Sequence, residues 1–254
     1  MKNDLFSIAG LTIHGYGLMI GIGFLAAYLL SDYRAKQKGL NPDHVFGLAV
    51  WGIGIGLVSA KLLYYITILD DIIRNPRILL DIANGFVVYG GIIGGIAGGY
   101  VYCRRHKLNF LKYADLIMPA VALAQGFGRI GCFLAGCCYG METEGAFAVV
   151  FRDSAYAPNG VRLLPTQLMS SGLNFMHFAV LMWLSGKWKR DGQTAAMYLI
   201  FYSIGRFVME FFRGDLIRGS VGSLTTSQFI SLFAAAAGAI MLLVSKKQTK
   251  SADN

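Results

Sequence analysis

Seven stretches of mostly apolar residues constrain this chain more than any other feature of its sequence. They lie near residues 10–30, 44–69, 85–102, 114–138, 166–186, 194–213 and 226–245. A helix that crosses a bilayer needs about 20 such residues. Hydrophobic residues make up 55% of the chain and charged residues 15%, against about 25% charged in soluble domains. The sequence predicts an all-α polytopic membrane protein with seven transmembrane helices, and it disfavours a soluble enzyme.

The segments between these windows are polar and charged, without a Pro/Ser-rich linker or a low-complexity tract. We therefore expect one membrane domain over residues 1–245, followed by a basic polar tail over residues 246–254. The first window is too long for a signal peptide and lacks a small-residue cleavage site, so we expect it to be retained.

The basic residues are unevenly divided between the two sides of the predicted membrane domain. With the N-terminus outside, the cytoplasmic segments hold 13 Lys and Arg residues and the outer segments hold 7. The positive-inside rule thus predicts an outer N-terminus and a cytoplasmic C-terminus. The net charge of +9 then faces anionic membrane lipids, which argues against a nucleic-acid partner.

Glycines recur every four residues in two of the windows. Gly90, Gly94 and Gly98 follow this spacing in the third window, and Gly52 and Gly56 follow it in the second. Small residues at this interval let helix backbones approach closely in lipid. We expect these glycines to serve helix packing.

Polar residues inside the windows are few and form stripes at helical spacing. The sixth window carries Tyr202, Arg206, Glu210 and Arg213, and the fourth carries Gln125, Arg129, Cys132 and Gly136. His14 and Tyr16 lie in the first window, Lys61 in the second, and Tyr89 near the start of the third. Under the predicted orientation these groups lie at one depth, so we expect a positively charged cavity near the outer leaflet.

Simpler interpretations of these residues stand beside that one. Arg206 and Glu210, at i and i+4, also fit a structural ion pair. His14 also fits an interfacial histidine, and Lys61 also fits a side chain that extends to the membrane surface. Arg129 has no acidic residue within a helical turn. A cation at this depth favours an anion, and a phospholipid phosphate binds guanidinium through two hydrogen bonds.

The role of three cysteines in and after the fourth window is open between two interpretations. Cys132, Cys137 and Cys138 match neither the spacing of a zinc ribbon nor a CxxC redox pair. In one interpretation the cysteines are apolar side chains that pack in the core. In the other, one of them is a reactive thiol in an electropositive pocket beside Arg129.

Five short segments, in order along the chain, resemble the bacterial prolipoprotein diacylglyceryl transferase family. In the fourth window the run from Gly128 to Gly136 resembles the family signature G-R-x-G-N-F-x-N-G-E. The other matches are His14-Gly15-Tyr16-Gly17-Leu18, Gly90-Gly91, Pro165-Thr166-Gln167-Leu168 and Arg206-Phe207-Val208-Met209-Glu210-Phe211-Phe212-Arg213. Together they span residues 14–213.

The resemblance implies transfer of a diacylglyceryl group from phosphatidylglycerol to the lipobox cysteine of a preprolipoprotein signal peptide. Glycerol phosphate leaves and a thioether remains, with no metal or soluble cofactor. It also implies a bacterial cytoplasmic (inner) membrane enzyme with its active site toward the outer leaflet.

The resemblance also assigns roles to residues of the polar stripes. Arg129 would bind the phosphatidylglycerol head group, Arg206 would be the second essential arginine, and Glu210 would orient it. Tyr16 and Tyr202 would line the pocket. The further predicted substrate-binding residues are His14, Gly131, Cys132 and Arg213.

The chain departs from the family pattern at several polar positions. Cys132, Ala135 and Cys137 stand where the signature has Asn, Asn and Glu. Tyr89 stands where many members have a His before the Gly-Gly pair. Tyrosine, with a reference pKa of about 10, is a poor base unless perturbed; Tyr89, Glu210 or solvent are the alternatives for accepting the thiol proton.

Two other functions stay open at this point. A divergent relative could move a lipid-derived group to another acceptor through a covalent intermediate on Cys132 or Cys137. A lipid transporter is less favoured, because repeated halves with broken helices, which are common in transporters, are not evident in the sequence.

Overall fold

The computed structural model describes residues 4–8, 11–82, 84–188, 190–215 and 219–250. The chain divides into two compact units. The first unit contains the residues up to Leu30 and those from Ala114 onward, and the second contains Ser31–Tyr113. The division falls inside two helices, α1 (Gly15–Gln37) and α5 (Phe110–Ala135). The single membrane domain over residues 1–245 stays a prediction.

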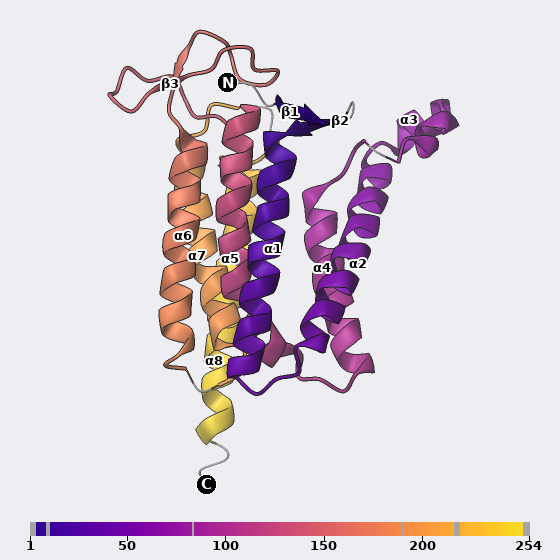
Figure 1. Ribbon diagram of the computed structural model, residues 1–254, viewed down its shortest axis with the longest axis vertical. Helices are drawn as coiled ribbons and strands as arrows, with labels where there is room; N and C mark the ends of the chain where they lie inside the picture. Colours follow the sequence, from indigo (N-terminus) through magenta and orange to yellow (C-terminus); the bar gives the residue numbers. More distant parts are fainter. Residues whose placement is uncertain (1–3, 9–10, 83, 189, 216–218, 251–254) are drawn as a thin grey trace. The chain divides into compact units, whose positions relative to one another are not determined.

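The first unit is built on long helices. Besides its parts of α1 and α5 it contains α6 (Thr166–Ser185), α7 (Gln193–Glu210) and α8 (Thr226–Lys250). Figure 1 shows these helices side by side, with α1, α6 and α8 running opposite to α5 and α7. The end of α5, the end of α7 and the start of α1 therefore lie at the same end of this unit.

Among the described residues, three antiparallel strand pairs accompany these helices. β1 (Asp4–Ile8) pairs with β2 (Leu11–His14), and β3 (Val149–Val150) pairs with β4 (Arg162–Leu163). β5 (Ser220–Val221) pairs with β6 (Leu224–Thr225). The segment between α5 and α6 has its own small core, in which Phe133, Phe151, Ala157 and Leu163 pack together.

A buried carboxylate fixes the start of α7 in the first unit. The Asp115 side chain on α5 accepts hydrogen bonds from the backbone N–H groups of Gly192 (2.7 Å) and Ala195 (2.8 Å). The first N–H groups of a helix lack partners within it, and a negative charge is favourable there. Asp115 therefore ties α5 to α7 at the end of the unit opposite the short hairpin β3–β4.

Besides the end of α1 and the start of α5, the second unit contains two packed helices and a short helical connection. α2 (Asp43–Thr67) is followed by α3 (Leu69–Arg74), the 3-10 helix η1 (Pro76–Leu80) and α4 (Val88–Arg105). The predicted glycine packing is confirmed here. A Cβ atom on Gly90 would lie 2.5 Å from the Ser59 carbonyl oxygen, and one on Gly98 would lie 3.0 Å from that of Trp51.

Each of the seven predicted windows contains a helix, although the windows do not all meet the length and apolarity of a membrane span. In the described residues five helices are long and apolar enough to cross a membrane, namely α1, α2, α5, α6 and α8. α4 and α7 have 18 residues each; α4 is rich in glycine, and α7 carries Arg206 and Glu210. Seven spans thus stay a prediction, while the mostly helical architecture is confirmed.

The structure corrects the ends of three windows, namely the first, the sixth and the last. Residues 11–14 belong to a strand, so His14 lies in β2, opposite Asp4, and not in the first helix. The β-hairpin is apolar enough to extend a hydropathy window although its backbone is extended. α7 ends at Glu210, so Arg213 lies in the segment beyond the helix. At the other end of the chain, α8 continues to Lys250, into the predicted tail.

Gly90→Ala should destabilise the protein, because the new methyl group meets backbone atoms of Ser59 and Ala60 that have little room to move. Overpacking of this kind costs about 1–3 kcal/mol, which thermal unfolding of the detergent-purified protein can detect. Gly54→Ala, on α2, is the matched control: a Cβ there has no atom within 4 Å, and alanine favours the helix by about 1 kcal/mol. Equal unfolding midpoints for the two variants would contradict the packing role.

Candidate active site

Two cavities adjoin each other in the first unit. The larger, of about 290 Å³, is lined by residues of α5, α6 and α7. The smaller, of about 190 Å³, is lined by residues of α1, α5, α6 and α7. Arg129, Asn174 and Tyr202 line both. These three side chains therefore mark the junction of the two cavities.

Arg129 is the cation at this junction. Within the described part of the chain its guanidinium has no hydrogen bond and no ion pair, and its side chain is half-buried. An arginine has five N–H donors and no acceptor. A guanidinium held between apolar helices with its donors uncommitted is suited to an anionic ligand.

The glycines beside Arg129 explain how α5 brings it between other helices. A Cβ atom on Gly126 would lie 2.5 Å from the Phe175 ring on α6, and the Ser171 hydroxyl donates to the Gly126 carbonyl at 2.9 Å. A Cβ atom on Gly131 would lie 3.2 Å from atoms of Tyr16 and Met19 on α1. These close approaches fix α5 against α6 on one side and α1 on the other.

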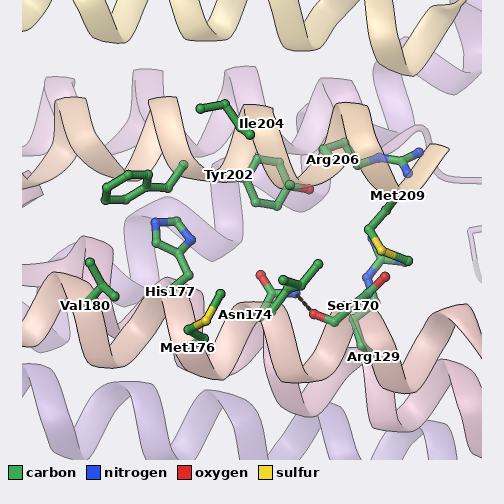
Figure 2. A pocket seen from close by; sticks show the side chains of 13 residues that line it. Arg129, Ser170, Asn174, Met176, His177, Val180, Tyr202, Ile204, Arg206 and Met209 are labelled. Atoms are coloured by element: carbon green, nitrogen blue, oxygen red, sulfur yellow. Dashed lines mark hydrogen bonds between the residues drawn. The ribbon is translucent and has the colours of Figure 1, made fainter. Parts of the chain in front are cut away.

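Arg206 lines the larger cavity from α7 and is held at both ends of its guanidinium. Its Nη1 lies 2.6 Å from Glu210 Oε2, and its Nη2 donates to the Ser227 hydroxyl on α8 at 2.7 Å. Figure 2 shows Arg129 and Arg206 toward one end of the cavity, with His177 and Val180 toward the other. Two guanidinium groups from different helices thus face the same space. The alternative of an ion pair between Arg206 and Glu210 is confirmed, and the pair still leaves donors of Arg206 for a ligand.

An aromatic stack forms part of the wall around the cavities. The His177 ring stacks on Tyr198 with ring centres 5.2 Å apart, and Tyr198 stacks on Tyr202 at 5.7 Å. Asn174, one turn before His177, donates to the Ser170 carbonyl at 2.8 Å (Figure 2). Asn174 and His177 are not among the residues predicted from the sequence, although polar residues at i and i+3 in an apolar window were a usable signal.

The three cysteines meet at the end of α5. Their sulfur atoms all lie within 4.8 Å of one another. Gly136, with φ +76°, ends the helix in the left-handed conformation, and the chain turns so that Cys137 and Cys138 approach Cys132. Beyond the end of α5, the Arg213 side chain lies beside the Cys138 sulfur.

The start of α6 holds this turn in place. The Gln167 amide donates to the Cys137 carbonyl at 2.9 Å, and the Thr166 hydroxyl donates to the Cys138 carbonyl at 3.1 Å. Both side chains are buried. The Pro165-Thr166-Gln167-Leu168 segment thus has a positioning role toward the cysteines.

The structure brings together most of the predicted site residues. Tyr16 and Cys132 line the smaller cavity, Arg206 lines the larger, and Arg129 and Tyr202 line both. Glu210 pairs with Arg206, and Gly131 packs behind the site against α1. Arg213 contacts Cys138 and forms a two-pronged ion pair with Asp215, at 2.8 and 2.6 Å.

Other predicted residues lie elsewhere. His14, in β2, is not among the described residues that line either cavity. Tyr89 is in the first turn of α4, in the second unit, and its place in the site stays a prediction. Lys61, also in the second unit, is buried and donates to the backbone carbonyls of Asp81 and Asn84. It has a structural role there.

Glu210→Gln should destabilise the protein strongly, because it leaves the Arg206 charge buried without its counterion. The paired side chains are only 13% and 4% exposed, and breaking such a pair costs about 3–5 kcal/mol. Asp32→Asn is the matched control, because it breaks an i, i+4 pair with Lys36 whose side chains are 22% and 64% exposed; exposed pairs contribute about 0–1 kcal/mol. Thermal unfolding in detergent compares the two variants, and similar losses would show that the Arg206 pair is solvated.

Comparisons with known proteins agree with the motifs noted in the sequence. A family model described as prolipoprotein diacylglyceryl transferase matches residues 3–244. A phosphatidylglycerol–prolipoprotein diacylglyceryl transferase of Clostridium tetani is 51% identical over 92% of this chain and 93% of its own length. A protein of Clostridium perfringens named phosphatidylglycerol–prolipoprotein diacylglyceryl transferase 2 is 46% identical over 97% of this chain and 96% of its own length. A phosphatidylglycerol–prolipoprotein diacylglyceryl transferase of Finegoldia magna is 34% identical over 100% of this chain and 99% of its own length.

Proposed function

The chain belongs to the prolipoprotein diacylglyceryl transferase family, and we propose that it transfers the diacylglyceryl group of phosphatidylglycerol to the lipobox cysteine of a preprolipoprotein signal peptide. The observation that carries the proposal for this site is the pair of guanidinium groups, Arg129 and Arg206, facing one cavity between α5, α6 and α7. A membrane protein with two cations at an apolar cavity is suited to a lipid that carries a phosphate.

The reaction forms one bond and breaks one. The lipobox thiol loses its proton, its sulfur attacks the glycerol carbon that carries the phosphoester oxygen, and the carbon–oxygen bond breaks. The electron pair of that bond leaves with glycerol phosphate, and a thioether remains. Negative charge develops on the departing oxygen, so cationic donors beside it lower the barrier.

The residues around the cavities divide these tasks. Arg129, with its donors uncommitted, binds the phosphate. Arg206 supplies the second positive charge, and Glu210 and Ser227 hold it in place. Tyr16 and Tyr202 line the head-group space, and apolar side chains of the larger cavity, such as Val180 and Ile204, accommodate the acyl chains.

We place the active site toward the outer leaflet of the bacterial cytoplasmic membrane, on seven spans with the N-terminus outside. Two observations support this orientation. The excess of Lys and Arg falls in the segments assigned to the cytoplasm. In the first unit the helices alternate in direction (Figure 1). Tyr16 is at the start of α1, and Arg129 and Arg206 are in the second halves of α5 and α7, so all three lie toward the end opposite the C-terminal end of α8.

The orientation predicts that a reporter fused after residue 254 is cytoplasmic. A fluorescent protein that folds only in the cytoplasm should be active there, and alkaline phosphatase, which requires export, should be inactive at the same position. Fusions in the segment between α5 and α6 should show the reverse pattern. Phosphatase activity at the C-terminus would overturn the proposed orientation.

Arg129→Ala should abolish most of the transfer activity, by about 10²–10³-fold, as expected for loss of one donor to a developing oxyanion. The assay incubates purified protein with phosphatidylglycerol and a lipobox peptide and measures the diacylglyceryl mass shift. Arg77→Ala, at an exposed arginine of η1, is the control and should keep full activity. The same assay tests Tyr89→Phe, whose full activity would remove Tyr89 as proton acceptor.

Complementation of a transferase-depleted strain provides the cellular version of this test. The wild-type chain should rescue growth and Arg129→Ala should not. Rescue by Arg129→Ala would overturn the role of Arg129, and absence of a mass shift with the wild-type protein would overturn the function.

A further inference from the structure

The three-cysteine cluster has the geometry of a metal site. Among the described residues, Cys132, Cys137 and Cys138 are a group whose ligand atoms are close enough to hold one ion, with all three sulfurs within 4.8 Å. A tetrahedral zinc ion with Zn–S bonds of about 2.3 Å places its sulfur ligands about 3.8 Å apart. Small side-chain rotations therefore bring the three sulfurs onto one ion.

The backbone around the cluster is held so that the thiols cannot easily separate. The Cys137 N–H donates to the Cys132 carbonyl at 3.1 Å. The buried side chains of Thr166 and Gln167 donate to the carbonyls of Cys138 and Cys137. Cys138 adopts φ +62°, a left-handed conformation that is uncommon outside glycine. Such a conformation persists where surrounding contacts impose it, and it is enriched at functional sites.

The ligand set selects the class of ion. Three thiolates and no oxygen ligand favour a soft or borderline ion over magnesium or calcium. Three protein ligands with a fourth position open are typical of catalytic zinc. The Arg213 guanidinium, which also pairs with Asp215, lies beside Cys138 at the edge of the cluster.

The cluster also adjoins the reaction space. Cys132 and Arg129 line the same small cavity, so a group bound to an ion at Cys132 shares that cavity with a phosphate bound to Arg129. The described residues that line this cavity include no carboxylate and no imidazole. None of these side chains is therefore an ordinary base for an incoming thiol.

We propose that Cys132, Cys137 and Cys138 bind one Zn²⁺ ion through their thiolates, and that its fourth position binds the lipobox thiol. This inference rests on the proposed transferase function. A thiol that coordinates zinc is deprotonated, so its proton passes to water on binding. The bound sulfur then attacks the glycerol carbon and the carbon–oxygen bond breaks. Glycerol phosphate leaves with the electron pair of that bond, while its phosphate is bound by Arg129.

Cobalt binding tests the metal site without requiring turnover. The full-length protein in detergent is reduced, treated with a chelator and titrated with Co²⁺, whose bonds to thiolates give a charge-transfer absorption in the near ultraviolet. We expect one equivalent to bind and Zn²⁺ to displace it. Cys132→Ser, Cys137→Ser and Cys138→Ser should each weaken Co²⁺ binding at least about tenfold.

The fourth cysteine provides the matched control. Cys103 is buried in α4, in the second unit, and Cys103→Ser should leave the cobalt spectrum unchanged. Absence of the charge-transfer band in the reduced wild-type protein would overturn the proposal, whatever the variants do. So would a band that survives simultaneous replacement of Cys132, Cys137 and Cys138.

A lipobox peptide tests the open position. Adding it to the cobalt-loaded protein without phosphatidylglycerol should increase the charge-transfer absorption as a fourth thiolate binds, and a peptide with Ser in place of its Cys should not. Equal spectra with the two peptides would overturn thiol binding at the ion. Transfer activity in protein that binds no metal would overturn this inference alone, whereas cobalt binding without any transfer would overturn the proposed function.

Discussion

Lipid offers no hydrogen-bonding partners, so a polar group that lies within it has to find a partner in the protein. Three cations in the apolar windows of this chain show three outcomes of that constraint. Lys61 donates to two backbone carbonyls of its own unit. Arg206 pairs with Glu210 and Ser227. Arg129 makes no hydrogen bond or ion pair within the described residues, and it is the cation that lines both cavities.

The scaffold that positions Arg129 depends on close helix approach. Gly126 and Gly131 lie three and two residues from Arg129 along α5, and each removes a side chain where another helix comes near. Without a hydrophobic driving force between helices in lipid, such contacts contribute much of the packing energy. The same glycines therefore stabilise the bundle and set the width of the site, so substitutions there affect stability and activity together.

The departures from the family signature gain meaning from their location. Cys132 and Cys137 replace two polar signature positions, and they lie with Cys138 in one cluster beside the smaller cavity. The cluster is held by Thr166 and Gln167, which belong to another of the resembling segments. Two segments separated along the chain thus form one local structure, in which thiols take the place of the usual amide and carboxylate.

The sequence by itself determined the helical class, the approximate position of each long helix, and the charged residues that line the cavities. Hydropathy and helical spacing report these features because they depend on local composition, and the ordered family motifs added the reaction. The sequence did not reveal that His14 lies in a strand, because an apolar hairpin and an apolar helix have similar hydropathy. It also missed Asn174 and His177, whose inward direction depends on how α6 is rotated against α5 and α7.

Only the tertiary structure decided which polar groups meet. The choice between an ion pair and a free cation for Arg206 depended on its side-chain direction and on Ser227, which is 21 residues away in the chain. The convergence of the three thiols depended on the left-handed backbone at Gly136 and Cys138 and on anchoring from α6. Such contacts are set by packing between distant segments, whereas spacing along one helix predicts only which residues share a face.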